Sequence, residues 1–220
     1  MGIGAYIPFW NQLTENQKGR LEAGAVQRKA AAGTLLQGSG SQCLGFVILR
    51  SGRLRVYILS DEGREITLYR LFERDMCLFT ASCVMKNIQF DVLVEAEMDT
   101  QMWVVPPELY KSLMEESAAA ANYTNQLIGS RFSEVMWLLE QVMWKSFDRR
   151  LAAFLLEESR LEGTPVLKIT HERIAAHMGT AREVVTRMLR YFQNEGLVRL
   201  SRGTVELADE KRLAQLEADS

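Results

Sequence analysis

Between positions 118 and 142, one set of residues recurs at alternate spacings of three and four, and this feature constrains the fold more than any other. The set is Ala118, Ala121, Asn125, Ile128, Phe132, Val135, Leu139 and Val142. The alternation is a heptad a/d seam, typical of a helix packed along a partner helix, in which one polar residue such as Asn125 commonly fixes register. We therefore expect a long helix that holds a homodimer. The expected interface residues are Asn125, Ile128, Phe132, Val135, Leu139 and Val142.

The same stretch is apolar on a second side. Its apolar residues outside the seam are Met136, Trp137, Leu138, Met143 and Trp144. A helix that is apolar on two sides must be covered on two sides. We expect one side to contact a second subunit and the other to contact the chain's own β-rich part. The alternative is an ordinary buried helix inside a monomer.

A β-rich region precedes this helix, from about residue 33 to residue 105, after a short helical region over 9–23. Residues 43–49 form an apolar, partly β-branched run. Leu54, Val56 and Ile58 then alternate with polar or aromatic residues, the period of a strand. Glycine-bearing turns separate several such short segments. The pattern predicts a β-sandwich or barrel.

The segment 171–189 has the pattern of a helix-turn-helix. Gly179 supplies the turn, which needs a residue that tolerates positive φ. Apolar residues at the offsets that fix the helix crossing are Ile174, Ala175, Met178, Val184, Val185, Met188 and Leu189. Thr170 and Thr180 stand where N-caps are wanted, and Thr180 with Glu183 fits the capping-box spacing. Residues 196–207 predict a small hairpin after the second helix, and the heptad break at Phe147 marks a domain boundary.

The polar face of the second helix carries the candidate DNA-reading residues, which are Arg182, Glu183, Thr186 and Arg187. Arginine can donate two hydrogen bonds to guanine, and glutamate can accept one from cytosine. Further expected DNA contacts come from Lys168, Thr170, Thr180, Arg190, Arg199 and Arg202. Arg190 is expected nearer phosphate or solvent, and Arg199 and Arg202 could reach phosphate. The alternative for Glu183 is a purely capping role.

Charge along the chain agrees with one DNA-facing patch. The whole chain has a net charge of −2. From residue 168 to residue 202, seven Lys or Arg side chains stand against three Glu side chains, which leaves +4. A local basic patch in an acidic chain is typical of nucleic-acid contact, although a solvated charged face gives the same pattern.

Several segments resemble the family of the cAMP receptor protein and the fumarate-nitrate regulator. The most specific is Gly179-Thr-Ala-Arg-Glu-Val-Val-Thr-Arg187, in which Arg182, Glu183 and Arg187 match the residues that read a TGTGA-like half-site in that family. Thr186 stands where relatives have Ser or Gly, so a variant operator is expected. Ser51-Gly-Arg-Leu-Arg-Val and Asp61-Glu-Gly-Arg-Glu are similar to the strands and hairpin of the family's β-roll.

The resemblance spans almost the whole chain and implies an α+β fold in three parts. Residues 1–106 would form an N-terminal double-stranded β-roll that resembles a cyclic-nucleotide-binding domain. Residues 107–146 would form the dimerisation helix, and residues 147–220 a C-terminal winged helix-turn-helix. The resemblance also implies an effector-modulated, homodimeric transcription regulator of a palindromic double-stranded operator, with RNA polymerase as a further partner. Its two recognition helices would enter major grooves about 34 Å apart.

The expected effector site departs from this family. Cyclic-nucleotide-binding members carry Gly-Glu and a later Arg-Ser. Here Thr80 stands in the place of the Glu, and Phe90-Asp91 stands in the place of Arg-Ser. A cyclic phosphate needs a cation, and Asp91 would repel it. Val135 and Met136 replace the polar residues that meet adenine. We therefore expect an effector other than cAMP. No cysteine precedes Cys43, which argues against a four-cysteine iron–sulfur cluster in one subunit.

Three kinds of sensor remain open: a thiol redox pair, a thiolate ligand to haem, and an apolar pocket for a small uncharged ligand. The candidate residues are Cys77, Cys83, Phe79, Phe90, Val135 and Met136. The alternative is that Cys77 and Cys83 are buried small hydrophobic residues.

Two other classes of protein fit less well. An enzyme built on the β-roll, as in metal-dependent cupins, needs metal ligands on the strands, but both histidines lie in the helix-turn-helix. His171-Glu172 lacks the histidine that the zincin spacing requires at i+4. We therefore expect neither an enzyme nor a metal site. The second alternative is a ligand- or redox-sensing protein whose helix-turn-helix does not read DNA directly.

The sequence also predicts a compartment. Its apolar runs are too short and too interrupted to span a membrane. Residues 1–8 show no basic stretch leading into an apolar one, as a signal peptide would. Three cysteines, an odd number, fit a reducing environment better than a disulfide framework. We expect a cytoplasmic protein with no membrane partner.

Overall fold

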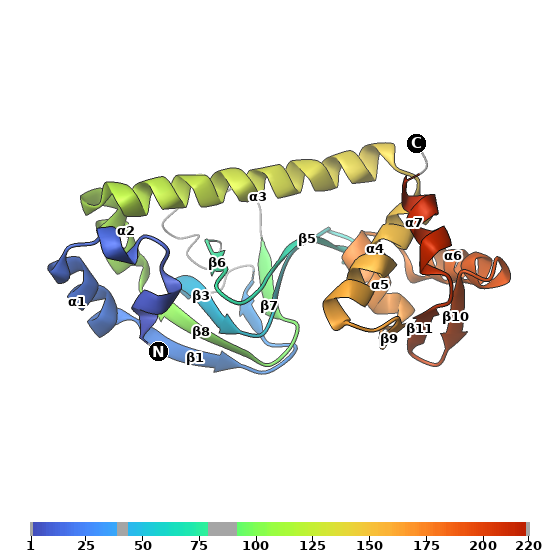
Figure 1. The fold of residues 1–220 in the computed structure, drawn as a ribbon, viewed down its shortest axis with the longest axis horizontal. Helices are drawn as coiled ribbons and strands as arrows, with labels where there is room; N and C mark the ends of the chain where they lie inside the picture. The colour runs from blue at the N-terminus through green and yellow to red at the C-terminus, as the bar shows by residue number, and fades with distance from the viewer. Residues whose placement is uncertain (1, 39–43, 79–91, 219–220) are drawn as a thin grey trace. The chain divides into compact units, whose positions relative to one another are not determined.

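The computed structural model describes residues 2–38, 44–78 and 92–218. The chain forms two compact units. The first comprises Met1–Leu59 and Leu68–Val135, and the second comprises Ser60–Thr67 and Met136–Ser220. We call them the β-roll unit and the helix-turn-helix unit, and each is described by itself (Figure 1).

In its described residues, the β-roll unit contains two four-stranded sheets. One has the strand order β1-β8-β3-β6 and the other has the order β2-β7-β4-β5. The strands are β1 (Val26–Ala30), β2 (Leu35–Gln37), β3 (Phe46–Ser51), β4 (Leu54–Leu59), β5 (Glu65–Leu71), β6 (Met76–Cys77), β7 (Leu93–Ala96) and β8 (Thr100–Val105). The first three residues of β5, 65–67, belong to the second unit. The predicted β-rich region is confirmed.

The first four residues of β3, 46–49, are buried on both faces of the strand, which explains why they are all apolar. Val47 and Leu49 belong to the core between the two sheets, together with Leu54 and Val56 of β4. Phe46 and Ile48, on the other face of β3, belong to a second core. Because successive strand residues point to opposite faces, a strand covered on both sides is apolar at every position.

Short helices cover that outer face of β3. They are η1 (Ile3–Tyr6), η2 (Trp10–Gln12), α1 (Glu15–Gly24) and α2 (Pro107–Glu116). Thr14 and Gln17 form a capping box that starts α1. The ring of Tyr110 in α2 stacks on Phe46, with centroids 3.7 Å apart, and its hydroxyl hydrogen-bonds Thr124 at 2.8 Å. These contacts join the helices to the sheet.

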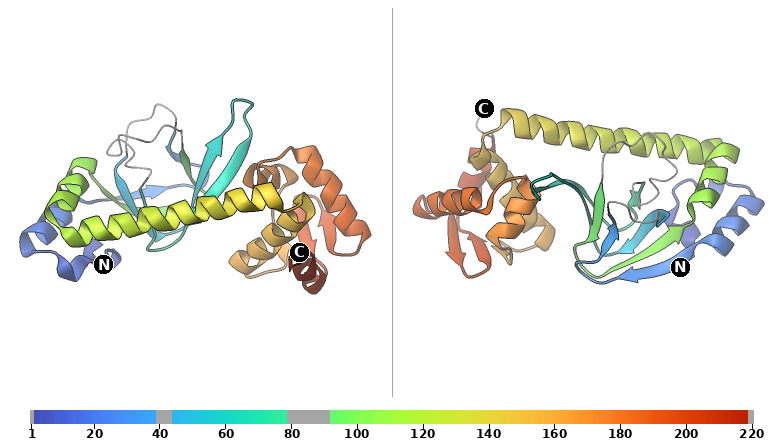
Figure 2. Two further views of the ribbon diagram at one scale, coloured as in Figure 1. Left: turned by 90° about the horizontal axis from the view of Figure 1, so that it is seen from above. Right: turned by 180° about the vertical axis from the view of Figure 1, so that it is seen from behind.

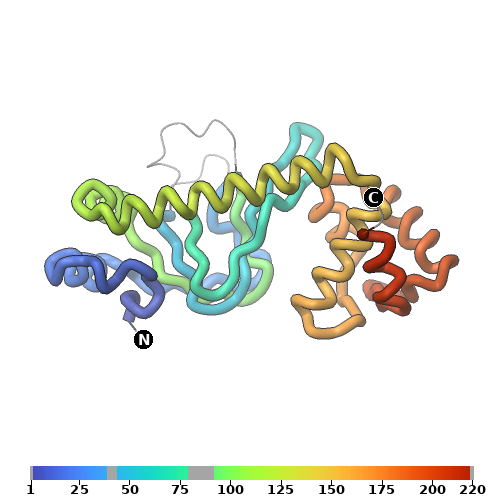
Figure 3. The backbone as a smooth tube through the Cα atoms, turned by 45° about the horizontal axis from the view of Figure 1, so that its top comes forward, coloured from blue at the N-terminus to red at the C-terminus, as the bar shows by residue number. Residues whose placement is uncertain are grey.

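The single helix expected from residue 107 onward is two helices. α2 ends at Glu116, and Ser117 is extended, with φ −126° and ψ 111°. α3 (Ala118–Trp144) then continues unbroken through the whole heptad seam (Figure 3). The Ser117 hydroxyl accepts a hydrogen bond from the backbone N–H of Ala120, so it satisfies one free donor of the new helix.

Among its described residues, the helix-turn-helix unit combines the end of α3 and four further helices with a three-stranded sheet (Figure 2). Its elements after α3 are α4 (Phe147–Glu162), β9 (Val166–Leu167), α5 (His171–Met178), α6 (Arg182–Asn194), β10 (Val198–Ser201), β11 (Thr204–Leu207) and α7 (Glu210–Ala218). The hairpin predicted over 196–207 is β10–β11, and β9 adds a third strand against β11. The new helix predicted from Phe147 is α4. No helix among the described residues is long and apolar enough to cross a membrane.

Candidate nucleic-acid interface

The turn between α5 and α6 forms as the sequence predicts. The Thr170 hydroxyl caps α5 by accepting from the Arg173 backbone N–H at 3.1 Å. Gly179 ends α5 in the left-handed region, with φ 68° and ψ 37°. Its N–H and that of Thr180 both bond the Ala175 carbonyl oxygen, which satisfies the end of the helix. Glycine is therefore required here by backbone conformation.

The predicted capping role of Thr180 is wrong. α6 begins at Arg182, its N-cap is Ala181, and no side chain caps it. Glu183 consequently sits at the second helical position, where the capping-box pairing with Thr180 does not form. The Thr180 backbone instead completes the end of α5, so Glu183 is left without a capping role.

α6 has one buried and one exposed face. Val185, Leu189 and Phe192 are fully buried in the core of the unit. Arg182, Glu183, Arg187 and Arg190 are exposed, and Thr186 is half-buried. Of the described residues, none pairs ionically with Arg182, Arg187 or Arg190. These guanidinium groups are free to meet an anion.

The other predicted DNA-contacting residues lie on the elements that flank α6. Lys168 is exposed ahead of α5, and Arg202 is exposed at the tip of the β10–β11 hairpin. Arg199, in contrast, pairs with Glu206 across the same hairpin, with Nη1 2.8 Å from Oε1. Both side chains of that pair face solvent, so the pair is weak. Arg202 is therefore the more available cation of the hairpin.

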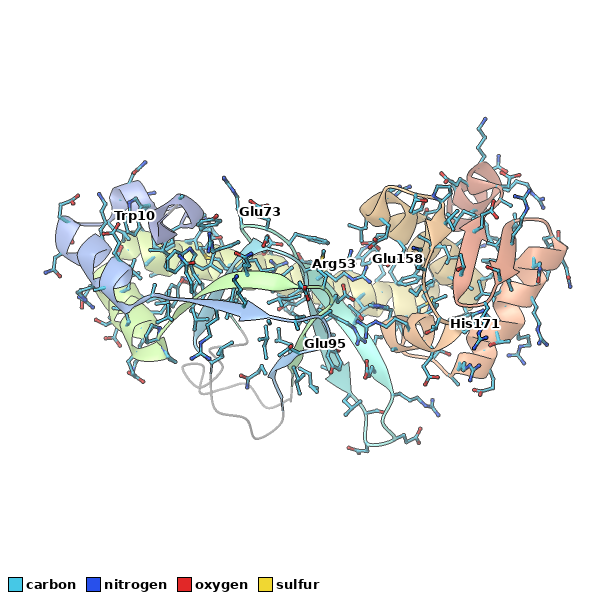
Figure 4. The ribbon with its side chains drawn as sticks, turned by 90° about the horizontal axis from the view of Figure 1, so that it is seen from below. Trp10, Arg53, Glu73, Glu95, Glu158 and His171 are labelled. Atoms are coloured by element: carbon cyan, nitrogen blue, oxygen red, sulfur yellow. The ribbon has the colours of Figure 1, made fainter. Side chains whose placement is uncertain are left out.

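The structure also brings together two residues that the sequence pattern did not link. His171, the first residue of α5, lies beside α6 (Figure 4), and its Nδ1 is 2.9 Å from the Thr186 hydroxyl oxygen. Burial, together with the charges of Arg182 and Arg190, holds the pKa of His171 below its ordinary value of 6.5. No periodicity in the sequence signals this contact, because it joins residues on two different helices.

A segment from the β4–β5 hairpin belongs to this unit as well. The Thr67 hydroxyl oxygen lies 2.8 Å from Nδ1 of the buried His177. Ile66 forms an isolated antiparallel bridge with Met178. A Cβ placed on Gly179 would lie 2.9 Å from Ile66 Cδ1. The turn of the helix-turn-helix is thus packed against residues more than a hundred positions earlier in the chain.

The seam residues of α3 are mostly exposed in the single chain. Ile128, Phe132, Leu139 and Val142 are between 41 and 65% exposed. Asn125 is exposed too, whereas Val135 packs partly against the core of the β-roll unit. An exposed apolar row of this length on one helix needs a partner.

Part of the candidate sensor site is described. Cys77 is buried in the core between the sheets and forms no disulfide with a described residue, and Val135 packs against that core. Met136 is 45% exposed and does not join them. The candidates Phe79, Cys83 and Phe90, and the positions Thr80 and Asp91, lie outside the described residues.

Comparison with known proteins covers both units. The cyclic nucleotide-binding domain matches residues 27–117, and the Crp-like helix-turn-helix domain matches residues 149–216. A crystal structure of a proposed transcriptional regulator of the crp/fnr family from Eubacterium rectale is 56% identical, with a TM-score of 0.96. That match covers 98% of this chain and 100% of the other.

Two curated relatives are more distant. The cyclic AMP receptor protein of Thermus thermophilus is 29% identical over 180 residues, 82% of each chain. The global nitrogen regulator of Synechococcus elongatus is 25% identical over 177 residues, 76% of this chain and 79% of the other. The two matched domains agree with the helix-turn-helix and the two-sheet β-roll of the structure, and one relative is 56% identical over nearly the whole chain. The chain therefore belongs to the Crp/Fnr family of transcription regulators.

Proposed function

We propose that this regulator reads its operator directly, through base contacts made by Arg182, Glu183 and Arg187. The observation that carries the proposal is the division of α6 into a buried apolar face and an exposed face bearing these three side chains. Arg182 and Arg187 are suited to donate paired hydrogen bonds to guanine O6 and N7. Glu183, which has no capping partner, is suited to accept from cytosine N4.

Phosphate contacts would position α6 in the groove. Lys168 and Arg202 are exposed cations on either side of it, and Arg190 is one turn beyond the base-reading residues. The Thr170 oxygen already accepts from Arg173, but its hydroxyl proton remains available to a phosphate oxygen. Such contacts fix orientation and contribute affinity without selecting sequence.

The operator would be a palindrome read by a homodimer. Except at Val135, the a/d seam of α3 is exposed from Asn125 to Val142, and it would pack against the same seam of a second copy. A two-fold axis between the copies would place the two α6 helices on half-sites about 34 Å apart. Bound to bacterial DNA, the dimer would act in the cytoplasm and would contact RNA polymerase.

The effector of this dimer would not be cAMP. In the sequence, Asp91 stands where the family's cassette has a residue that helps hold the cyclic phosphate, and the described core around Cys77 is apolar. A ligand that binds the folded state stabilises it by mass action. Adding millimolar cAMP should therefore leave the melting temperature unchanged, and a rise would refute this part of the proposal.

Selection of binding sites from random DNA, followed by variants, tests direct readout. Arg182→Ala and Arg187→Ala should each lower affinity for the selected site by about 1–3 kcal/mol and relax the preference at one base pair. Arg202→Ala is the matched control because it removes the same charge. It should weaken binding to all sequences alike and reduce the salt dependence. Unchanged base preference in both α6 variants would overturn the proposal.

A further inference from the structure

Thr186 is a half-buried residue of α6 that lies along the helix between the exposed Arg182 and Arg190. It follows Arg182 by one turn and precedes Arg190 by one turn, so the three side chains form one row along the helix. The same two arginines act on the pKa of His171, which agrees with a position for the imidazole beside Thr186. His171 thus approaches this row from the start of α5.

The hydroxyl of Thr186 is already engaged within the protein. Its oxygen lies 2.9 Å from Nδ1 of His171, in a hydrogen bond whose donor depends on the ring tautomer. Threonine is β-branched, so fixing the direction of its hydroxyl also fixes its methyl group. In the tautomer with the ring proton on Nε2, Nδ1 accepts the hydroxyl proton of Thr186, and that proton is then not available to a base. In that arrangement the methyl group is the part of Thr186 left for the groove.

A methyl group in the major groove has one specific partner among the bases. The C5-methyl of thymine offers apolar contact, and threonine methyl groups are among its usual partners. We propose that Thr186, held by His171, selects a thymine in each half-site through its methyl group. Thr186 is then a specificity-determining residue and His171 its positioning residue. The inference rests on the proposed direct readout by α6.

The probe is the DNA duplex selected by the full-length protein, with each thymine of a half-site replaced in turn by deoxyuridine. Deoxyuridine lacks only the C5-methyl, so it leaves every hydrogen bond of the base in place. Replacement at one position should lower affinity about fourfold, the effect of one buried methyl group. If no position responds, the assignment of Thr186 is wrong.

Two substitutions of Thr186 separate its methyl from its hydroxyl. Thr186→Val keeps a methyl group and removes the hydroxyl, so sensitivity to deoxyuridine should persist. Thr186→Ser keeps the hydroxyl and removes the methyl, so the sensitivity should disappear. A Ser variant that retains the fourfold effect would overturn the inference.

Substitutions of His171 test the positioning role. His171→Ala releases the Thr186 hydroxyl and should reduce the discrimination between thymine and deoxyuridine, with the preferences at other base pairs unchanged. His171→Asn places an amide near the position of Nδ1 and should restore it. If His171→Ala keeps full discrimination, His171 has no such role.

Failure of the underlying function gives a different result. If Arg182→Ala and Arg187→Ala leave all base preferences unchanged, direct readout by α6 fails as a whole. If those variants lose their guanine preferences while no thymine responds to deoxyuridine, only the inference about Thr186 fails.

Discussion

The β-roll unit and the helix-turn-helix unit use arginine in opposite ways. In the β-roll unit, Glu97 lies between two arginines, and its Oε2 is 2.9 Å from Nε of both Arg53 and Arg70. Arg55 is fully buried, 3.9 Å from Glu95 and with its guanidinium over the ring of Tyr57 (Figure 4 labels Arg53 and Glu95). These cations are neutralised inside the fold.

In the helix-turn-helix unit the core is apolar and the arginines of α6 are exposed. Exposed guanidinium groups without carboxylate partners remain available to a polyanion, whereas buried and paired ones do not. The comparison teaches that the placement of arginine, rather than its number, determines which part of an acidic chain can contact DNA.

The largest effect is expected from breaking the buried charge cluster. Glu97→Ala leaves two guanidinium groups without their shared carboxylate, which should destabilise the β-roll unit by about 3–5 kcal/mol. Glu206→Ala, which removes the partner of the exposed Arg199, is the control and should cost less than about 1 kcal/mol. Hydrogen exchange of amides in β4 and β7 measures the first effect and that of β10 the second. Equal destabilisation by Glu97→Ala and Glu206→Ala would contradict the difference that we draw between the two units.

The helix that continues from one unit into the other offers a second comparison, between its two exposed apolar stripes. Phe132 is 65% exposed at an a position of the seam, and Trp144 is 77% exposed at the f position on the opposite side. Phe132→Ala should raise the dimer dissociation constant about thirtyfold, from roughly 2 kcal/mol lost at a buried aromatic contact.

Trp144→Ala should leave the dissociation constant nearly unchanged, although this side chain is the more exposed of the two. Analytical ultracentrifugation over a range of concentrations gives both values. A larger effect at Trp144 than at Phe132 would show that the copies meet through the other stripe.

The two units also differ in how far apart in sequence their contacts lie. The β-roll core joins strands from the whole first half of the chain, whereas the helix-turn-helix core comes from residues 151–213. The exception is the packing of Ile66 on Gly179. Gly179→Ala should cost about 1–2 kcal/mol for the left-handed backbone alone, and more because the new Cβ meets Ile66.

Gly163→Ala is the matched control for that substitution. Gly163 has a similar φ of 65°, but a Cβ there would have no atom within 4 Å. The excess cost at Gly179, measured by thermal denaturation, is therefore the contribution of Ile66. In a double-mutant cycle with Ile66→Ala this excess should fall without vanishing, because Cδ1 and Cγ1 are removed while the Cβ of residue 66, 3.1 Å from the new Cβ, remains. Equal costs for the two glycines would mean that Ile66 does not restrict the turn.

How much could be predicted from the sequence follows from this difference in contact range. The turn at Gly179, the cap at Thr170 and the buried positions of α6 depend on neighbours within one helix pair, so spacing alone predicts them. The heptad likewise predicted α3 because its period is local. Alternation in residues 53–58 predicted β4. Burial of Arg55, in contrast, depends on Tyr57 and on Glu95, and the contact with Glu95 on another strand has no signal in the sequence pattern.

Where the prediction of the site failed, a local rule was overruled by geometry. Thr180 and Glu183 have the capping-box spacing, yet α6 begins one residue later than that spacing requires, because the Thr180 backbone completes the end of α5. The contact of His171 with Thr186 depends on the crossing of two helices, so it had no signal in the sequence.

The smallest expected effect is a pH dependence of DNA binding, which would show that DNA phosphates lie close to the exposed face of α6. Burial, Arg182 and Arg190 lower the pKa of His171 in the free protein, and Glu172 is the next residue of its own helix. DNA phosphates near α6 favour the protonated imidazole and should raise that pKa. The complex then binds more protons than the free protein, so affinity should increase as pH falls between the pKa of the complex and the lower pKa of the free protein.

The affinity should increase by less than about tenfold, because a rise of one unit in the pKa of His171 on binding corresponds to a tenfold change and we expect a smaller rise. His171→Asn keeps a polar group near Thr186 but cannot titrate, so its affinity should be flat across the same pH range. Fluorescence anisotropy at constant ionic strength measures both proteins. An equal slope in the Asn variant would assign the proton to another group. A flat profile of the unmodified protein would show that DNA does not shift the pKa of His171, and a weaker affinity at low pH would show that binding lowers this pKa.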